Sequence, residues 1–168
     1  NLELLEEAST MFCCDSLADI ARTHANTTME NHFRDDYTSY HLVCYDMNDG
    51  SVVRKQTVQG YADDSAWARG QAWALYGYTM MYRETGDENY LNQAVNVGDM
   101  IAGYLPEDGV AYWDFNDPAI PDTYRDASAA AVMASAYIEL SGYVNSGKKK
   151  EYRKIAETIL RTLASEEY

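Results

Sequence analysis

Hydrophobic residues recur at helical spacing along most of the chain, and breaks in that pattern divide it into segments. The stretch from Leu2 to about Asn31 predicts a helical hairpin, with Asp15 as the N-cap of its second helix. A longer helix is predicted from about Ser65 to Glu84. Its end is expected at Gly86, because glycine readily takes the left-handed conformation that closes a helix.

Three further helices are predicted after this glycine, over about 89–104, 126–143 and 149–165. Asp87 is positioned to cap the first of them, and Asp126 the second. An irregular loop that contains Pro118 and Pro121 separates these two helices over 106–125. Long loops at one end of a helical array often carry a site, so we expect this loop and the one over 31–64 to be functional.

The segment between the first hairpin and the long helix has a different pattern. Two runs of β-forming residues, Tyr40–Tyr45 and Ser51–Gln56, flank the turn Asn48-Asp49-Gly50. This pattern predicts a small β-hairpin near 40–57, inserted between helices. The chain is therefore predicted to be all-α apart from this insertion, with residues 1–168 in one domain.

Charge and composition exclude several classes of binding partner. The 168 residues carry 27 acidic and 13 basic side chains, a net charge of −14, so attraction to phosphate backbones is not a general driving force. We expect no nucleic-acid partner and no membrane partner, since no apolar run of about 18 residues is present. Three cysteines without CxxC spacing favour neither a disulfide framework nor a zinc site. Unpaired thiols suit the cytoplasm, or alternatively the periplasm.

The stretch over 59–73 is the densest in side chains suited to chemistry, with two carboxylates, two indoles, one guanidinium and two amides. Ser65 or Asp64 is its expected helix N-cap. A helix N-terminus joined by the guanidinium of Arg69 can receive a carboxylate, so an anionic sugar would fit there. The candidates for substrate binding in this stretch are Gln59, Ser65, Trp67, Arg69 and Trp73. Alternatively, the guanidinium only pairs with Asp63 or Asp64, and the indoles belong to the core.

His41 and Asp114 are candidates outside that stretch. A lone histidine is often a hydrogen-bonded structural residue, but His41 can also take part in catalysis. Asp114 lies among aromatic residues, which can raise the pKa of a carboxyl group, although loop acids often face water. His24 and His32 are predicted to face solvent. Scattered histidines and the lack of a calcium-loop motif predict no metal site, and missing P-loop and GxGxxG motifs predict no nucleotide cofactor.

Taken together, several of these motifs resemble the unsaturated glucuronyl hydrolases of glycoside hydrolase family 88. The resemblance is carried by Asn-Leu-Glu-Leu-Leu at 1–5, His41, the run over 59–73, Asp-Gly-Val-Ala-Tyr-Trp-Asp-Phe at 108–115, Pro121-Asp122 and Arg-Asp-Ala-Ser-Ala at 125–129. A related family that acts on unsaturated rhamnogalacturonan fragments usually has Asn where Gln71 stands. The motif Trp-Ala-Arg-Gly-Gln-Ala-Trp at 67–73 therefore resembles the unsaturated glucuronyl hydrolases more than the rhamnogalacturonan family.

The resemblance implies an (α/α)6 toroid of six helical hairpins, of which this chain would be about half. It also implies a glycosidase of carbohydrate metabolism, in glycosaminoglycan degradation, that removes a 4,5-unsaturated uronic acid from the non-reducing end of lyase-generated oligosaccharides. In this family an aspartic acid protonates C4 of the double bond and then activates water for C5. No cofactor is implied.

Residue by residue, the resemblance implies that His41 assists the catalytic acid. It gives Gln59, Ser65 and Arg69 the role of sugar ligands, and Trp67 and Trp73 that of stacking walls. The family's proton donor would lie just upstream of Asn1, so these 168 residues alone are expected to be inactive. Another chain, or another segment of the same chain, would complete the toroid. The alternative is a non-catalytic helical-repeat module that binds carbohydrate or protein through its tryptophans.

Overall fold

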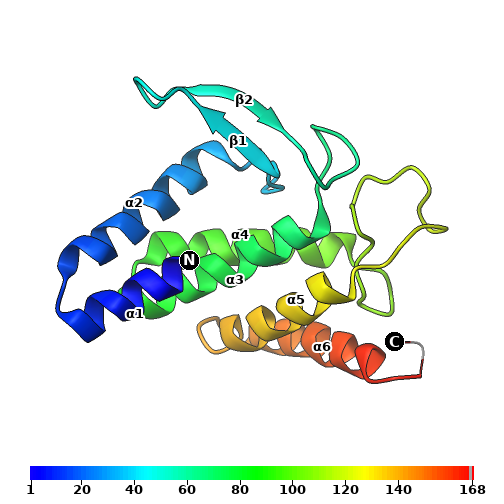
Figure 1. The fold of residues 1–168 in the computed structure, drawn as a ribbon. Coiled ribbons are helices and arrows are strands. Elements are labelled where there is room, and N and C mark those ends of the chain that lie inside the picture. The colour runs from blue at the N-terminus through cyan, green and yellow to red at the C-terminus, as the bar shows by residue number, and fades with distance from the viewer. Residues whose placement is uncertain (167) are drawn as a thin grey trace.

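The computed structural model describes residues 1–166 and 168, and over these residues the chain forms six helices and one two-stranded sheet (Figure 1). In chain order the elements are α1 (Leu2–Phe12), α2 (Asp15–Asn31), β1 (Leu42–Tyr45), β2 (Val52–Gln56), α3 (Ala68–Thr85), α4 (Glu88–Tyr104), α5 (Ala127–Leu140) and α6 (Ser146–Leu163). The all-α prediction with a small β insertion is confirmed.

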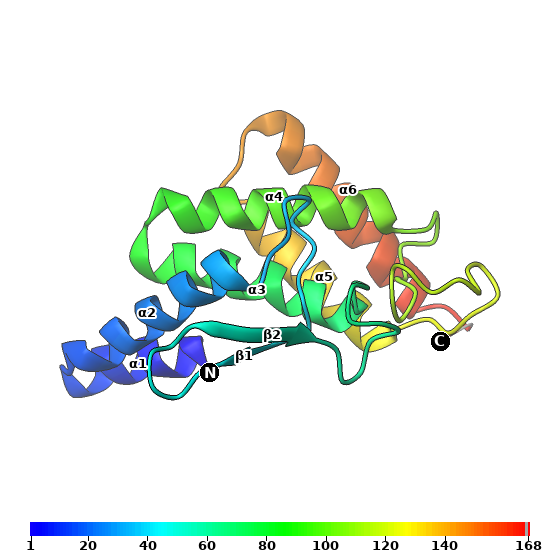
Figure 2. The same cartoon turned by 90° about the horizontal axis from the view of Figure 1, so that it is seen from above.

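The helices are arranged as three successive hairpins. Each odd-numbered helix packs against the even-numbered helix that follows it, and α3 also packs against α5 and, less extensively, against α1 (Figures 1 and 2). The odd-numbered helices therefore form one row, with α3 in the middle, and the even-numbered helices flank it. Three hairpins match the half toroid that the family resemblance implies.

The core is centred on α3. Leu75 is fully buried, as are Val97 of α4 and Tyr137 of α5. The Tyr137 hydroxyl donates a hydrogen bond of 2.6 Å to the carbonyl of Gly98, which brings α4 and α5 together. A Cβ atom at Gly98 would lie 3.4 Å from both the Leu75 and the Tyr137 side chains, so glycine permits this close approach.

Most helix ends match the sequence-based expectations. Asp87 caps α4 by accepting a hydrogen bond from Asn89 N–H, and Asp126 caps α5 by accepting one from Ala129 N–H. Gly86 ends α3 with a φ of 68°, in the left-handed region. Asn145 accepts two backbone N–H groups at the start of α6, which therefore begins three residues before its predicted first residue, Lys149.

Two predicted caps are wrong. The helix predicted from Ser65 starts at Ala68, and Trp67 occupies its N-cap position. The cause is a contact with the 106–125 loop: Ala68 N–H donates to the Trp113 carbonyl, and Phe115 N–H donates to the Ala66 carbonyl. These bonds hold the chain extended as far as Trp67. In α2, Asp15 is the first helical residue and Cys14 is the N-cap.

The β-hairpin is antiparallel, with Val43 opposite Lys55 and an irregularity in the register between Cys44 and Tyr45. Gly50, with a φ of 74°, lies in the predicted turn. The hairpin lies beside α2 and the start of α3, and the loop over 106–125 reaches the same end of α3 (Figures 1 and 2). The two long connections thus meet where α3 begins.

Apolar side chains are exposed on the two outer hairpins. Leu4, Met11 and Phe12 of α1 are exposed, and so are Ile138 of α5 and Leu160 of α6. Over residues 1–166 and 168, no helix combines the length and the apolar character that a membrane span requires.

Candidate active site

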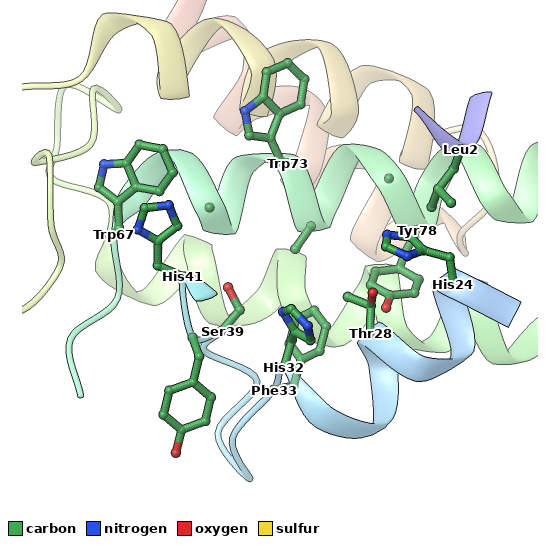
Figure 3. A pocket seen from close by; sticks show the side chains of 14 residues that line it. Leu2, His24, Thr28, His32, Phe33, Ser39, His41, Trp67, Trp73 and Tyr78 are labelled. Carbon is green, nitrogen blue, oxygen red and sulfur yellow. The ribbon is translucent and has the colours of Figure 1, made fainter. Parts of the chain in front are cut away.

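A cavity of about 320 Å³ lies between α2, α3 and the residues that lead into β1 (Figure 3). His41 and Trp67 lie at one end of it, and Leu2 and His24 at the other, with Trp73 between them along α3. The other lining residues are Thr28, His32, Phe33, Ser39, Tyr40, Gly70, Ala74, Gly77 and Tyr78. Three of the six predicted site residues therefore share one cavity.

His41 is held through its Nδ1 atom. The backbone N–H groups of Val58 and Gln59 both donate to Nδ1 at 3.1 Å, and the Thr57 hydroxyl lies 3.3 Å away. Because two obligatory donors point at Nδ1, we assign the ring proton to Nε2. Burial lowers the pKa of His41, which favours the same neutral form.

Trp67 connects the histidine to the arginine. The rings of His41 and Trp67 have their centroids 4.5 Å apart at an interplanar angle of 33°. The guanidinium carbon of Arg69 lies 5.3 Å from the Trp67 ring centroid, in cation–π range. Trp73 is 52% exposed and forms a wall of the cavity, so the indoles are not buried in an apolar core.

Arg69 pairs with Asp126 rather than with Asp63 or Asp64. Its Nε and Nη2 atoms lie 3.1 Å and 3.0 Å from Oδ2 of Asp126, whose other oxygen caps α5. The Arg69 side chain is 40% exposed, and within the described part of the chain Nη1 has no hydrogen-bond partner. Arg69 does not line the cavity itself, and it lies beside the indole that does.

Ser65 and Gln59 are placed next to the cavity lining. The Ser65 hydroxyl is buried and donates a 2.6 Å hydrogen bond to Asp114. Gln59 is exposed and contacts His41 through its backbone N–H. Asp114 is fully buried and accepts hydrogen bonds from Ser65, from Tyr61 N–H and from Asn116 N–H, so it does not face water. The roles of Ser65 and Gln59 as sugar ligands stay predictions.

Gln71 joins the chain before β1 to α3. Its buried side-chain amide accepts a 2.8 Å hydrogen bond from Ser39 N–H, and it donates to the carbonyls of Ser39 and Trp67 at 3.3 Å and 3.2 Å. Ser39 lies two residues before His41. The amide therefore aligns the histidine with the start of α3, a role that sequence reasoning did not identify.

The expectation that His32 faces solvent is wrong. His24 and Thr28 of α2 and the C-cap residue His32 recur every four residues, and this face of the helix lines the cavity. His32 is partly buried, and burial lowers its pKa. The four-residue spacing was visible in the sequence, but polar neighbours hid which face of the helix is covered.

Stability should fall as the pH drops below about 6.5, the usual pKa of histidine in unfolded chains. Because burial depresses the pKa of His32 and His41, the unfolded chain takes up protons that the folded chain does not. His32→Gln should reduce the dependence of the thermal midpoint on pH between 5.5 and 7.5, measured in the full-length protein. His24→Gln, at the exposed rim, should have a smaller effect in the same direction, because the charge of His24 is only the second cause of the lowered His32 pKa after burial. An unchanged dependence in His32→Gln contradicts the expectation.

No aspartate or glutamate lines the cavity within the part of the chain that the structure describes. Nor do residues 1–166 and 168 contain a group of three or more His, Cys, Asp or Glu side chains arranged to hold a metal ion. The cavity is lined by aromatic rings together with the hydrogen-bonding side chains of histidine, serine and threonine, a lining suited to a sugar ring.

Known proteins resemble this chain over its whole length. An unsaturated glucuronyl hydrolase of Formosa agariphila is 49% identical over 170 residues, which cover 100% of this chain and 42% of that protein. The crystal structure of an unsaturated glucuronyl hydrolase specific for heparin matches 99% of this chain and 45% of its own, with a TM-score of 0.96 and 47% identity. No protein-family model matches the chain.

A variant of the Streptococcus agalactiae unsaturated glucuronyl hydrolase, in complex with dGlcA-GalNAc6S, matches 98% of this chain and 45% of its own with a TM-score of 0.85 and 30% identity. The chain thus spans less than half the length of the relatives that it matches. Its three hairpins form part of an (α/α)6 toroid, the fold of these enzymes. The chain belongs to the family of the unsaturated glucuronyl hydrolases.

Proposed function

We propose that the protein containing this chain removes a 4,5-unsaturated uronic acid from the non-reducing end of an oligosaccharide released by a lyase. The proposal rests on the cavity that His41, Trp67 and Trp73 line, with the two indoles following one another along α3 (Figure 3). Sugar rings stack on indole faces, and their hydroxyl groups need polar atoms at the edge of the stack. The relatives named above support the reaction class.

The proposed reaction consumes one water molecule. A carboxylic acid delivers a proton to C4 of the double bond, and the oxygen of water bonds to C5 as the water gives one of its protons to the carboxylate. The hemiketal then opens by cleavage of the bond between C5 and the ring oxygen, which leaves a ketone at C5 and a hemiacetal at C1. The hemiacetal collapses to an aldehyde, so that the bond between C1 and the glycosidic oxygen breaks and the next sugar leaves with the hydrogen of the C1 hydroxyl group. Because the cavity lining lacks a carboxylate in the described residues, we propose that the rest of the protein supplies it.

The rest of the protein would also cover the exposed apolar side chains. Leu4, Met11 and Phe12 lie on the first hairpin, and Ile138 and Leu160 lie on the last. In a toroid these two hairpins are the ones that meet further neighbours. We propose that segments of the same polypeptide close the ring here, since the relatives are more than twice as long as this chain.

Arg69 would attract the substrate carboxylate. Among the described residues Nη1 has no hydrogen-bond partner, while Asp126 fixes the other side of the guanidinium. Arg69→Ala should lower kcat/KM about ten- to hundredfold, mainly through KM, because a charge-assisted hydrogen bond is lost. Asp126→Asn should have a smaller effect in the same direction, since Arg69 keeps its charge and loses its anchor. Steady-state kinetics of the full-length protein check both, and unchanged kinetics in Arg69→Ala remove this residue from the site.

The direct test of the proposed function is an absorbance assay. The full-length protein is mixed with unsaturated disaccharides prepared from chondroitin and from heparin, and the ultraviolet absorbance of the conjugated double bond is followed. Loss of absorbance with release of the second sugar is expected. Stable absorbance with both substrates, together with saturable binding of either, would favour the non-catalytic binding module instead.

A further inference from the structure

The groups around His41 indicate which protonation form of its ring takes part in the reaction, an inference that rests on the proposed function. We propose that the loop over 57–65 is a clamp that fixes His41 as a neutral ring with its proton on Nε2. In this role His41 donates a hydrogen bond to the substrate or to the catalytic acid, and it does not accept a proton at Nε2. Gly60 and Asp114 are positioning residues of the clamp.

The first support is the set of groups at Nδ1. Val58 N–H and Gln59 N–H each donate to it at 3.1 Å, and backbone N–H groups cannot reverse their role. A proton on Nδ1 would point at these two donors, which disfavours both the other tautomer and the imidazolium ion. The neutral ring with the proton on Nε2 is the form that satisfies every group present.

The second support is that the loop carrying these donors is itself tied down. Thr57 N–H donates to Asp63 at 2.8 Å, and Gly60 N–H donates to the Thr57 hydroxyl at 2.7 Å. Because that hydroxyl oxygen accepts from Gly60, its own hydrogen is free to point at Nδ1 of His41. Three residues in a row thus present donors to one ring nitrogen.

Asp114 anchors the far end of the loop. One of its oxygens accepts Tyr61 N–H at 2.9 Å and the Ser65 hydroxyl at 2.6 Å, and the other accepts Asn116 N–H at 3.0 Å. The carboxylate is fully buried, so these bonds are not exchanged with water. An asparagine here would place its NH₂ group against at least one backbone N–H, and the loop would have to shift.

Gly60 gives independent evidence that the loop is closely packed. A Cβ atom at this position would lie 2.5 Å from the Thr57 hydroxyl oxygen and 3.0 Å from Oδ2 of Asp114. Both atoms belong to the clamp. Any side chain at Gly60 therefore displaces the groups that orient His41.

The opposite nitrogen of the ring is open. Within the described residues Nε2 has no hydrogen-bond partner, while the ring packs on Trp67 and lines the cavity. Its proton is thus available to an oxygen atom in the cavity. A donor of this kind can hold a carboxylate or a hydroxyl group in place over the whole pH range in which the ring is neutral.

The test is the tautomer, measured by nitrogen NMR on the full-length protein with ¹⁵N-labelled histidine. His41→Gln identifies the resonances by their loss. In the neutral ring Nδ1 is expected to show the shift of an unprotonated nitrogen and Nε2 that of a protonated one, with a titration midpoint below that of a free histidine. A protonated Nδ1 in the neutral ring, or a titration midpoint at or above that of a free histidine, overturns the proposal. This readout needs no turnover, so its failure is distinct from failure of the absorbance assay.

Substitutions in the clamp provide a second test of the proposal. Gly60→Ala and Asp114→Asn should each lower kcat/KM about tenfold, mainly through kcat, and add a new ionisation near pH 6 to 7 to the pH profile. The His41 nitrogen shifts should move toward a tautomer mixture. Asp122→Asn, an exposed acid of the same loop as Asp114, is the control. Variants that keep a native circular dichroism spectrum, the wild-type tautomer and the wild-type pH profile contradict the clamp.

His41→Gln and His41→Ala separate the proposed role from general acid–base catalysis. A glutamine amide can place an N–H near the position of Nε2 but cannot exchange a proton with the substrate. His41→Gln should therefore retain at least tenfold more activity than His41→Ala. Equal loss in the two variants would indicate that the ring itself must transfer a proton, against the proposal.

Discussion

The 168-residue chain on its own is expected to leave the absorbance of an unsaturated uronate disaccharide unchanged, whereas the full-length protein is expected to abolish it. The reason is chemical. Hydration of the double bond needs a proton donor, and no carboxylate lines the cavity within the described residues. A positioned general acid contributes about 10²- to 10⁴-fold, so turnover by the short chain should be lower by at least that factor.

The comparison needs a check that the short chain is folded. Circular dichroism should show its helices, and a small unsaturated disaccharide should still quench the fluorescence of Trp67 and Trp73 if the cavity is intact. Turnover by the short chain at a rate within tenfold of the full-length rate would contradict this account. Asp114 would then be a poor candidate for the acid, because it is buried and fully hydrogen-bonded.

Gln71→Ala is expected to lower the free energy of unfolding by about 3 kcal/mol and to reduce kcat/KM at least tenfold. The substitution leaves Ser39 N–H, which is buried, without its partner, and each such loss costs about 1–3 kcal/mol. It also frees the chain that carries His41 from α3. Urea unfolding and steady-state kinetics of the full-length protein measure the two effects.

Gln93→Ala is the matched control. Gln93 is also a buried glutamine on a helix, but its Nε2 atom has no hydrogen-bond partner in the described residues. Removing it should therefore cost less than removing Gln71 and should leave kcat/KM within about twofold. Equal destabilisation by both substitutions would indicate that loss of packing, rather than loss of the hydrogen bonds to Ser39, dominates.

The fold could be predicted well because its signals are local. Helical periodicity, the Asp-Gly turn of the β-hairpin, Gly86 and the caps Asp87 and Asp126 each act within a few residues. The predicted start of α3 was wrong because a segment distant in the sequence determines where this helix begins. The backbone bridge between Trp67 and Asp114 keeps the chain extended past Ser65, and no local pattern reports such a pairing.

The site could be predicted in part. The residue types suited to sugar binding pointed to Trp67 and Trp73, and the family resemblance pointed to His41, and these three share a cavity. The partner of Arg69 could not be foreseen, because Asp126 lies 57 residues away and was identified only as a helix cap. The clamp around His41 was also hidden, since its donors are backbone groups that every sequence contains.

A crystal structure of the full-length His41→Ala variant soaked with an unsaturated disaccharide would locate the bound sugar. We expect the unsaturated ring against Trp67 and Trp73, with its carboxylate toward Nη1 of Arg69. A disaccharide bound elsewhere, or a cavity filled by side chains from the rest of the polypeptide, would contradict this expectation.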